Sequence, residues 1–279
     1  MEYCRQASIA VEHARADSSE LYYGYGKSRL KGLGLEYIDF REYEPGDDFR
    51  RIDWRLTARS PGVEGFRLFV KEYEEEHMHD VSLAVSLSPS IFYKDKPYTM
   101  TYTASLVTLL AQRLGDRLTL HLLGGGIERI DVSLPTAPYR VKKAVCSGPR
   151  KVLGRELLTL AKTISRGTLV LVLDYDLDPG ILAQTLRAAR SRGIGVLTIL
   201  VYSLREVKPP GPGEVLVTSP SGSVYGDLNE IYDSIIRHVN RVDSTASAYS
   251  RTIKVESSSV RRLRRRIVDE YLRARSRRA

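Results

Sequence analysis

Two polar clusters in the sequence contain residue types that could do chemistry. The first lies within residues 41–59 and combines guanidinium groups, carboxylates and aromatic rings: Arg41, Glu42, Tyr43, Asp47, Asp48, Arg51, Asp53, Trp54 and Arg59. Guanidinium groups pair bidentately with carboxylates and stack on aromatic rings, so this set suits recognition more than proton transfer. The nine are candidate partner-binding residues. They could instead pair with one another and clamp the N-terminal segment onto the main domain, which is the hypothesis we favour.

The second cluster follows two apolar segments that we expect to be strands. Ser86, Ser88 and Ser90 come at the end of the first segment, and Asp174 and Asp176 follow the second, residues 169–173. The carboxyl ends of parallel strands meet at one edge of a sheet, where ligands bind. Hydroxyl and carboxylate oxygens are ligands for Mg²⁺. Alternatively, the serines satisfy backbone groups of their loops by hydrogen bonding.

These side chains must be positioned by elements that alternate along the chain from residue 81 onward. We expect strands at residues 81–86, 117–123, 127–132, 169–173 and 195–201, and helices at 97–114, 179–192 and 227–241, with two more within 137–165. Gly124 to Gly126 read as a hairpin turn. Residues 214–218 are expected to form a weak edge strand, and 251–256 a second edge strand. This pattern predicts a right-handed, doubly wound, mostly parallel α/β sheet with one antiparallel edge.

The remaining segments divide the chain into three expected parts. Residues 1–76 form a β-rich extension with a short helix at 5–16, residues 77–250 the sheet domain, and residues 251–279 a basic amphipathic helix. The formal net charge is +9, but residues 261–278 hold nine arginines against two acids, net +7, which leaves +2 for the rest. Val260, Leu263, Ile267, Tyr271 and Ala274 form the apolar stripe of this helix. The helix could dock on its own domain, on a partner or on an anionic surface.

Cysteine content and hydropathy bear on the compartment. Cys4 and Cys146 are the only cysteines, too few for a disulfide framework, and they fit a reducing environment. The apolar segments have the length of strands and fall short of the roughly 18 residues that a membrane span needs. Residues 1–10 lack the apolar stretch of a signal peptide. We therefore expect a cytoplasmic protein without a transmembrane segment.

The first cluster closely resembles the signature of the domain of unknown function 58 family. Sixteen positions match its motifs: Gly34, Glu36, Tyr37, Arg41, Glu42, Tyr43, Pro45, Gly46, Asp47, Asp48, Arg51, Ile52, Asp53, Trp54, Ala58 and Arg59. In members of this family the signature precedes a von Willebrand factor A-like domain. The resemblance spans roughly residues 30–200.

In the von Willebrand factor A-like family, the first strand ends in Asp-x-Ser-x-Ser, and a further Asp completes a magnesium site. Here Ser86 replaces the leading Asp, while Ser88, Ser90 and Asp174 match. At an effective dielectric near 20, a charge pair about 4 Å apart contributes ~4 kcal/mol, so losing one carboxylate could weaken binding by up to about three decades. The resemblance thus implies a degenerate metal site, with no cofactor required and only weak Mg²⁺ binding.

These observations lead us to predict a non-catalytic protein–protein interaction module without a small-molecule substrate. The family resemblance implies a partnership with a MoxR-type AAA+ ATPase in the remodelling or maturation of other proteins. The alternative is nucleic-acid or anionic-membrane binding through residues 261–279. A metal-dependent hydrolase is the weakest hypothesis, because adjacent motifs supply no set of nucleophile, base and oxyanion donors.

Overall fold

The computed structural model describes residues 2–24, 37–59, 61–62, 65–73, 79–131, 136–150, 154–164, 166–208, 214–219 and 222–275. Two compact units make up the chain. The larger one, which we call the sheet unit, comprises residues 1–21 and 79–279. The other, the small unit, comprises residues 22–78.

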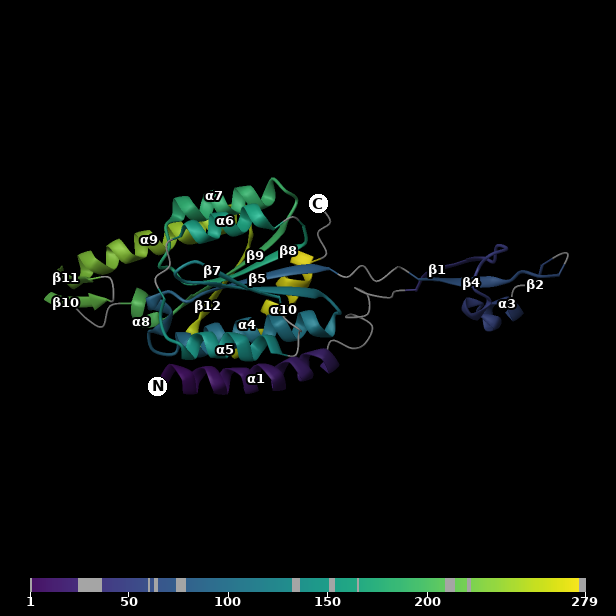
Figure 1. Cartoon of the computed structure of the whole chain (residues 1–279), viewed down its shortest axis with the longest axis horizontal. Helices are drawn as coiled ribbons and strands as arrows, with labels where there is room; N and C mark the ends of the chain where they lie inside the picture. Colours follow the sequence, from purple (N-terminus) through teal and green to yellow (C-terminus); the bar gives the residue numbers. More distant parts are fainter. Residues whose placement is uncertain are drawn as a thin grey trace. The chain divides into compact units, whose positions relative to one another are not determined.

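A six-stranded sheet forms the centre of the sheet unit. Its strands are β5 (Asp80–Ser86), β6 (Arg117–Leu123), β7 (Ile127–Asp131), β8 (Thr168–Leu173), β9 (Gly195–Tyr202) and β12 (Arg251–Glu256). They follow the order β12-β9-β8-β5-β6-β7, and all neighbours are parallel except β6 and β7 (Figure 1). Every residue of β8 is buried, as is typical of a central parallel strand rich in Val and Leu. The predicted mostly parallel α/β sheet is confirmed.

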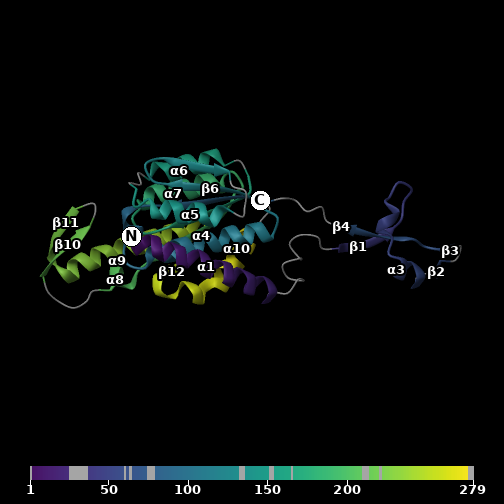
Figure 2. The ribbon, with the colours of Figure 1, turned by 60° about the horizontal axis from the view of Figure 1, so that its bottom comes forward.

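Helices cover both faces of this sheet (Figures 1 and 2). One face packs against α6 (Arg155–Thr163), α7 (Pro179–Arg190) and α9 (Leu228–Tyr249). The other is covered by α4 (Lys96–Arg113), α5 (Ala137–Cys146) and α10 (Arg264–Arg275), with α1 (Glu2–Gly24) outside α4 and α5. Because α4 has the sheet on one side and α1 on the other, it is buried along most of its length.

The two expected edge strands have different outcomes. Residues 251–256 form β12, which extends the sheet beside β9 as predicted. Residues 214–218 do form a strand, β10 (Glu214–Ser219), but its predicted place at the edge of the sheet is wrong, because β10 pairs with β11 (Gly222–Asp227) in a separate two-stranded hairpin. Strands this close in sequence pair locally, whereas the 22 residues of α9 carry the chain back to the sheet before β12 begins.

The helices at both ends of the chain belong to the sheet unit, which differs from the three expected parts. The apolar side of α1, formed by Ala7, Ala10, Val11 and Ala14, is buried. Residues 257–263 form a 3₁₀ segment, η4 (Ser257–Leu263), that leads into α10. Four members of the predicted stripe, Val260, Ile267, Tyr271 and Ala274, are at most 2% exposed. Both terminal segments therefore bury their apolar sides in the same unit, so they are not separate parts.

Cys4 on α1 and Cys146 at the end of α5 form a disulfide. Their Cα atoms are 4.6 Å apart although 142 residues separate them in sequence. This corrects the expectation of two reduced cysteines. That expectation failed because the sequence alone does not show that α1 packs beside α5. Within the described ranges, no helix combines the length and the apolar character needed to cross a membrane.

The small unit is built on an antiparallel pair of strands, β1 (Tyr37–Glu42) and β4 (Phe69–Tyr73). Between them come the 3₁₀ turn η1 (Phe49–Arg51), the helix α3 (Trp54–Arg59) and a short hairpin of β2 (Pro61–Gly62) and β3 (Gly65–Phe66). Ile52 and Val70 form a bridge and are buried. A few apolar contacts and many backbone hydrogen bonds therefore hold this unit together.

Candidate functional site

The carboxyl edge of the sheet brings together four of the five predicted metal-site residues. Ser86 ends β5, Ser88 and Ser90 lie at the start of η2 (Pro89–Phe92), and Asp174 follows β8. The Oδ2 atom of Asp174 accepts hydrogen bonds from Ser88 Oγ at 2.6 Å and from Ser90 Oγ. Ser86 Oγ accepts from the backbone N–H of Ser88 at 3.3 Å. The fifth residue, Asp176, is exposed.

Lys96 is part of this cluster, and sequence reasoning missed it. It begins α4, and its side chain is only 2% exposed. Its Nζ atom lies 3.5 Å from Ser90 Oγ and 2.7 Å from Glu206 Oε1. Glu206 in α8 (Leu204–Val207) also accepts a hydrogen bond from the backbone N–H of Ser203. One signal was present in the sequence: a cation in the first turn of a helix opposes the helix dipole and therefore needs a local partner.

Burial dominates the electrostatics of this cluster. Asp174 is 1% exposed, and desolvation raises the pKa of its carboxyl group. The charge of Lys96 and the hydrogen bond from Ser88 lower this pKa, whereas the charges of Asp176 and Glu206 raise it. The net direction is upward. The cluster thus contains one buried ammonium group between two carboxyl groups, Asp174 and Glu206.

The oxygen atoms at this edge do not fit the magnesium site that the von Willebrand factor A-like resemblance implies. Three hydroxyl groups and one buried carboxyl group are a weak ligand set for a divalent cation. In addition, the ammonium group of Lys96 already lies within hydrogen-bond distance of Ser90, and it would repel a metal ion there. Nowhere in the described part of the chain do three or more His, Cys, Asp or Glu side chains gather as a metal-binding group.

In the small unit, Asp47 closes the turn after β1. Its two carboxylate oxygens accept bidentate hydrogen bonds from Arg41 at 2.6 and 2.7 Å, and Oδ2 also accepts from the backbone N–H of Glu44. The turn contains Gly46, whose φ of 116° favours glycine. This bidentate pair lies within the small unit. It therefore stabilises the unit's own turn, and Asp47 has a structural role there.

The other two aspartates of the signature begin helical turns. Asp48 Oδ1 accepts from the backbone N–H of Arg50 and caps η1. Asp53 Oδ1 accepts from the N–H groups of Arg55 and Leu56, both at 3.0 Å, at the start of α3. Aspartate is a favoured N-cap residue because its oxygen satisfies N–H groups that have no partner within the helix. These two aspartates of the signature thus fix where η1 and α3 begin.

Two large aromatic side chains of the small unit face solvent. Phe49 is 65% exposed and Trp54 is 64% exposed. Trp54 is one of the predicted partner-binding residues, whereas Phe49 was missed because it lies in a polar run without periodicity. The guanidinium group of Arg50 lies 5.8 Å from the centre of the Phe49 ring. Arg55 and Arg59 on α3 are also exposed.

The other predicted partner-binding residues have varied surroundings. Glu42 pairs with Arg67 at 3.1 Å on the surface. Tyr43 is partly buried, and its backbone N–H donates to Leu68 O. Arg51 ends η1, and its side chain lies outside the described residues. The eight of these side chains that the structure describes therefore do not form one uniform surface.

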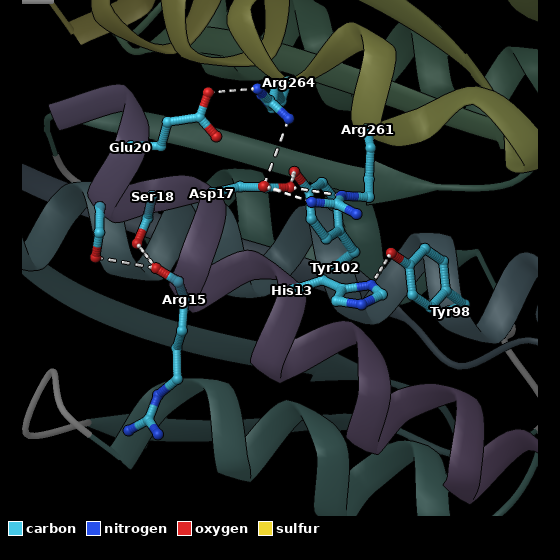
Figure 3. Close-up of polar contacts among 10 residues, drawn as sticks. His13, Arg15, Asp17, Ser18, Glu20, Tyr98, Tyr102, Arg261 and Arg264 are labelled. Carbon is cyan, nitrogen blue, oxygen red and sulfur yellow. Dashed lines mark hydrogen bonds and ion pairs between the residues drawn. The ribbon is translucent and has the colours of Figure 1, made fainter. Parts of the chain in front are cut away.

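Two arginines near the end of the chain, Arg261 and Arg264, pair with the buried Asp17 of the sheet unit (Figure 3). Arg261 donates to both oxygens of Asp17 on α1, at 2.7 and 2.8 Å, and Tyr102 on α4 donates to Asp17 at 2.8 Å. Arg264 contacts Asp17 and Glu20. Burial would raise the pKa of Asp17, but the hydrogen bonds from Arg261 and Tyr102 and the charges of both arginines outweigh it, so the pKa is lowered.

Comparisons with known proteins place these features in a family. The family model described as "Protein of unknown function DUF58" matches residues 39–247, which include both polar clusters. "Uncharacterized protein Rv1480" of Mycobacterium tuberculosis and "Uncharacterized protein Mb1516" of Mycobacterium bovis are each 29% identical to this chain over 212 residues. The alignment covers 72% of this chain and 65% of each relative, so the chain spans about 65% of their length.

Two solved structures are also similar. One is described as the conserved hypothetical protein BatB from Bacteroides thetaiotaomicron, with 14% identity and a TM-score of 0.45. The other is described as an aerotolerance-related membrane protein from Bacteroides fragilis, with 14% identity and a TM-score of 0.43. Each match covers 70% of this chain and 99% of the solved chain.

Proposed function

Because this chain belongs to the DUF58 family of proteins of unknown function, we propose that it is a non-catalytic protein-binding module. The observation that carries this proposal is the exposure of Phe49 and Trp54 in the small unit. Among the described residues these are the two most exposed large apolar side chains, and Trp is enriched among the residues that dominate binding energy at protein interfaces.

The surroundings of these two rings support recognition of a protein surface. Arg50, Arg55 and Arg59 are exposed close to them in sequence. Arginine is enriched at interfaces, where its guanidinium group pairs with carboxylates. The aspartates next to them are engaged as caps or in the Arg41 pair, so the part of this surface described here is aromatic and basic. A partner surface with an apolar pocket and an acidic rim would be complementary to it.

The partner we propose is a MoxR-type AAA+ ATPase, in a system that remodels or matures other proteins. This choice comes from the resemblance of the signature in residues 34–59 to that of the DUF58 family. At the carboxyl edge of the sheet, the buried Asp174 accepts hydrogen bonds from Ser88 and Ser90, and Lys96 is paired with Glu206, so these contacts join the loops of the sheet unit to one another.

A binding assay with the full chain tests this proposal. A MoxR-type ATPase from the same genome is titrated against the wild-type chain, a Trp54→Ala variant and a Phe49→Ala variant. If these rings anchor the partner, each substitution should weaken binding by about 30-fold, which corresponds to ~2 kcal/mol. The matched control is Tyr139→Ala, which removes an aromatic ring that is 40% exposed on the sheet unit.

Two results would contradict the proposal. One is the absence of binding between the folded wild-type chain and the ATPase. The other is equal binding by the wild-type chain, both variants and the control.

Binding of nucleic acid or an anionic membrane through residues 261–279 remains the alternative. Arg262 and Arg266 are exposed on this segment, whereas Arg261, Arg264 and Arg275 have carboxylate partners within the sheet unit. Steeply salt-dependent binding that is lost in an Arg262→Glu, Arg266→Glu double variant would favour this alternative.

A further inference from the structure

We propose that the ammonium group of Lys96 takes the place of a divalent cation at the carboxyl edge of the sheet. This internal cation would connect the η2 turn after β5 with the end of β8, which a metal ion would otherwise connect, and it would also hold α8 there. The proposal concerns the sheet unit only, and it is independent of the partner surface proposed for the small unit.

The contacts of Lys96 carry the first step. Its Nζ atom reaches Glu206 Oε1 on α8 at 2.7 Å and Ser90 Oγ on η2 at 3.5 Å. Ser90 in turn donates to Asp174, which follows β8. One amino group at the start of α4 is therefore linked to two carboxyl groups from different elements, directly to one and through a hydroxyl group to the other.

The burial of Lys96 carries the second step. Lysine is almost never fully buried unless it is paired, yet this side chain is 2% exposed. It also lies in the first turn of an 18-residue helix, where the helix dipole disfavours a positive charge. Both costs must be offset by specific interactions, which are the direct contact with Glu206 and the negative charge that Asp174 places behind Ser90. The position is therefore suited to a fixed positive charge.

The chemistry of the neighbouring oxygens carries the third step. An ammonium group has three N–H donors and binds hydroxyl and carboxylate oxygens, which are also the ligands of a hard divalent cation. Position 86 holds a serine where the von Willebrand factor A-like family has a carboxylate, so the site has one negative charge fewer. A single positive charge, such as that of Lys96, then balances the site more readily than a divalent ion would. Because Lys96 and a metal ion would repel each other, only one of them can be held at this site.

Binding of Mn²⁺ as a probe, followed by electron paramagnetic resonance and by calorimetry, tests the proposal. The wild-type chain should show no saturable site below about 1 mM Mn²⁺. In a Ser86→Asp, Lys96→Met double variant, a carboxylate replaces the hydroxyl group and the ammonium group is removed, so a single site at least about 10-fold tighter should appear. Lys94→Met is the matched control, because it removes an exposed lysine two residues away and should bind Mn²⁺ as the wild type does.

Thermal unfolding supplies a second measurement. The Lys96→Met variant should melt below the wild type in the presence of a chelator, because two carboxyl groups lose their cation. Added Mg²⁺ should raise the melting temperature of the double variant and leave that of the wild type unchanged.

Saturable Mn²⁺ binding by the wild-type chain at this site, with a Kd below about 1 mM, would overturn the proposal even if no variant folds. A folded double variant that binds Mn²⁺ no better than the wild type would also overturn it. Neither result depends on whether the chain binds an ATPase, so this proposal and the proposed function can fail separately.

Discussion

The two units use the same kinds of polar residues in different ways. The sheet unit buries charged groups and pairs them internally, as for Asp17 with Arg261 and for Lys96 with Glu206. The small unit uses aspartates to close a turn and to begin helices, and it leaves Phe49 and Trp54 in solvent. Burial makes an unpaired charge costly, whereas at the surface water solvates polar groups and leaves aromatic rings available for contact. A polar cluster in a sequence can therefore be interpreted as a binding site or as internal pairing only when the burial of its side chains is known.

This contrast also separates two kinds of expected mutational effect. Substitutions of paired charges in the sheet unit should lower its stability, whereas substitutions of exposed aromatic residues in the small unit should change binding and leave stability nearly unchanged. Four measurements test the stability side of this contrast, and the binding assay with the Trp54→Ala and Phe49→Ala variants tests the other side.

Replacing Asp17 with alanine should have the largest effect. Its side chain is 2% exposed and accepts hydrogen bonds from Arg261 and Tyr102, so its loss leaves these donors without their buried partner. We expect the free energy of unfolding to fall by about 3–5 kcal/mol, measured by denaturant titration. The control is Glu20→Ala on the same helix, whose side chain is 62% exposed and whose loss should cost less than ~1 kcal/mol. Equal effects of the two substitutions would contradict the role given to Asp17.

Removing the disulfide should have the next largest effect. A Cys4→Ser, Cys146→Ser variant loses the covalent link between α1 and α5, which closes a long loop. The free energy of unfolding should fall by about 2–4 kcal/mol. Thiol titration of the unreduced, denatured wild-type chain should detect no free cysteine. Two reactive thiols in that titration would show that the pair is reduced in the purified protein.

In the small unit, Asp47→Ala should weaken local structure by a smaller amount. The substitution removes the bidentate pair with Arg41 and the acceptor for the Glu44 N–H. Local stability should fall by about 1–2 kcal/mol, seen as faster hydrogen exchange in β1 and β4 with unchanged exchange in the sheet unit. Glu42→Ala, which removes an exposed ion pair with Arg67, is the control and should change exchange little.

The smallest expected effect is on the pH dependence of stability, to which two aspartates of the sheet unit should contribute with opposite signs. The pKa of Asp17 is lowered, so its contribution to stability is present above the ordinary value of 3.8 and is lost as the pH falls through the folded value. The pKa of Asp174 is raised by burial, so its contribution is largest below its ordinary value and decreases as the pH rises through the folded value. Unfolding of Asp17→Asn and Asp174→Asn variants from pH 3 to pH 7, compared with the wild type, measures both slopes. Slopes of the same sign would contradict these assignments.

Much of the fold follows from the sequence because the signals are local. The all-buried run of β8 and the alternating strands and helices after residue 81 are sufficient to predict a mostly parallel sheet. The same reasoning places Ser88, Ser90 and Asp174 at one edge, since parallel strands end there together. The caps at Asp178 and Asp227 also lie where the predicted helices begin.

The functional features were predicted less completely because they depend on contacts between distant segments. Lys96 joins the serine cluster only because α4 begins beside the carboxyl edge, next to α8, which is 110 residues away in the chain. The exposure of Phe49 and Trp54 depends on how η1 and α3 pack, which residue types do not reveal. The separate hairpin of β10 and β11 likewise depends on a choice between a local and a distant strand partner.

Sequence is sufficient to predict the sheet class, the family signature and the amphipathic terminal helices, because each depends on neighbouring residues or on a short period. Tertiary structure alone decided that both terminal helices belong to the sheet unit, that Cys4 meets Cys146, and that a buried lysine lies among the serines. The physical reason is that burial and charge pairing depend on which elements pack together. Which distant elements meet is therefore seen only in the folded structure.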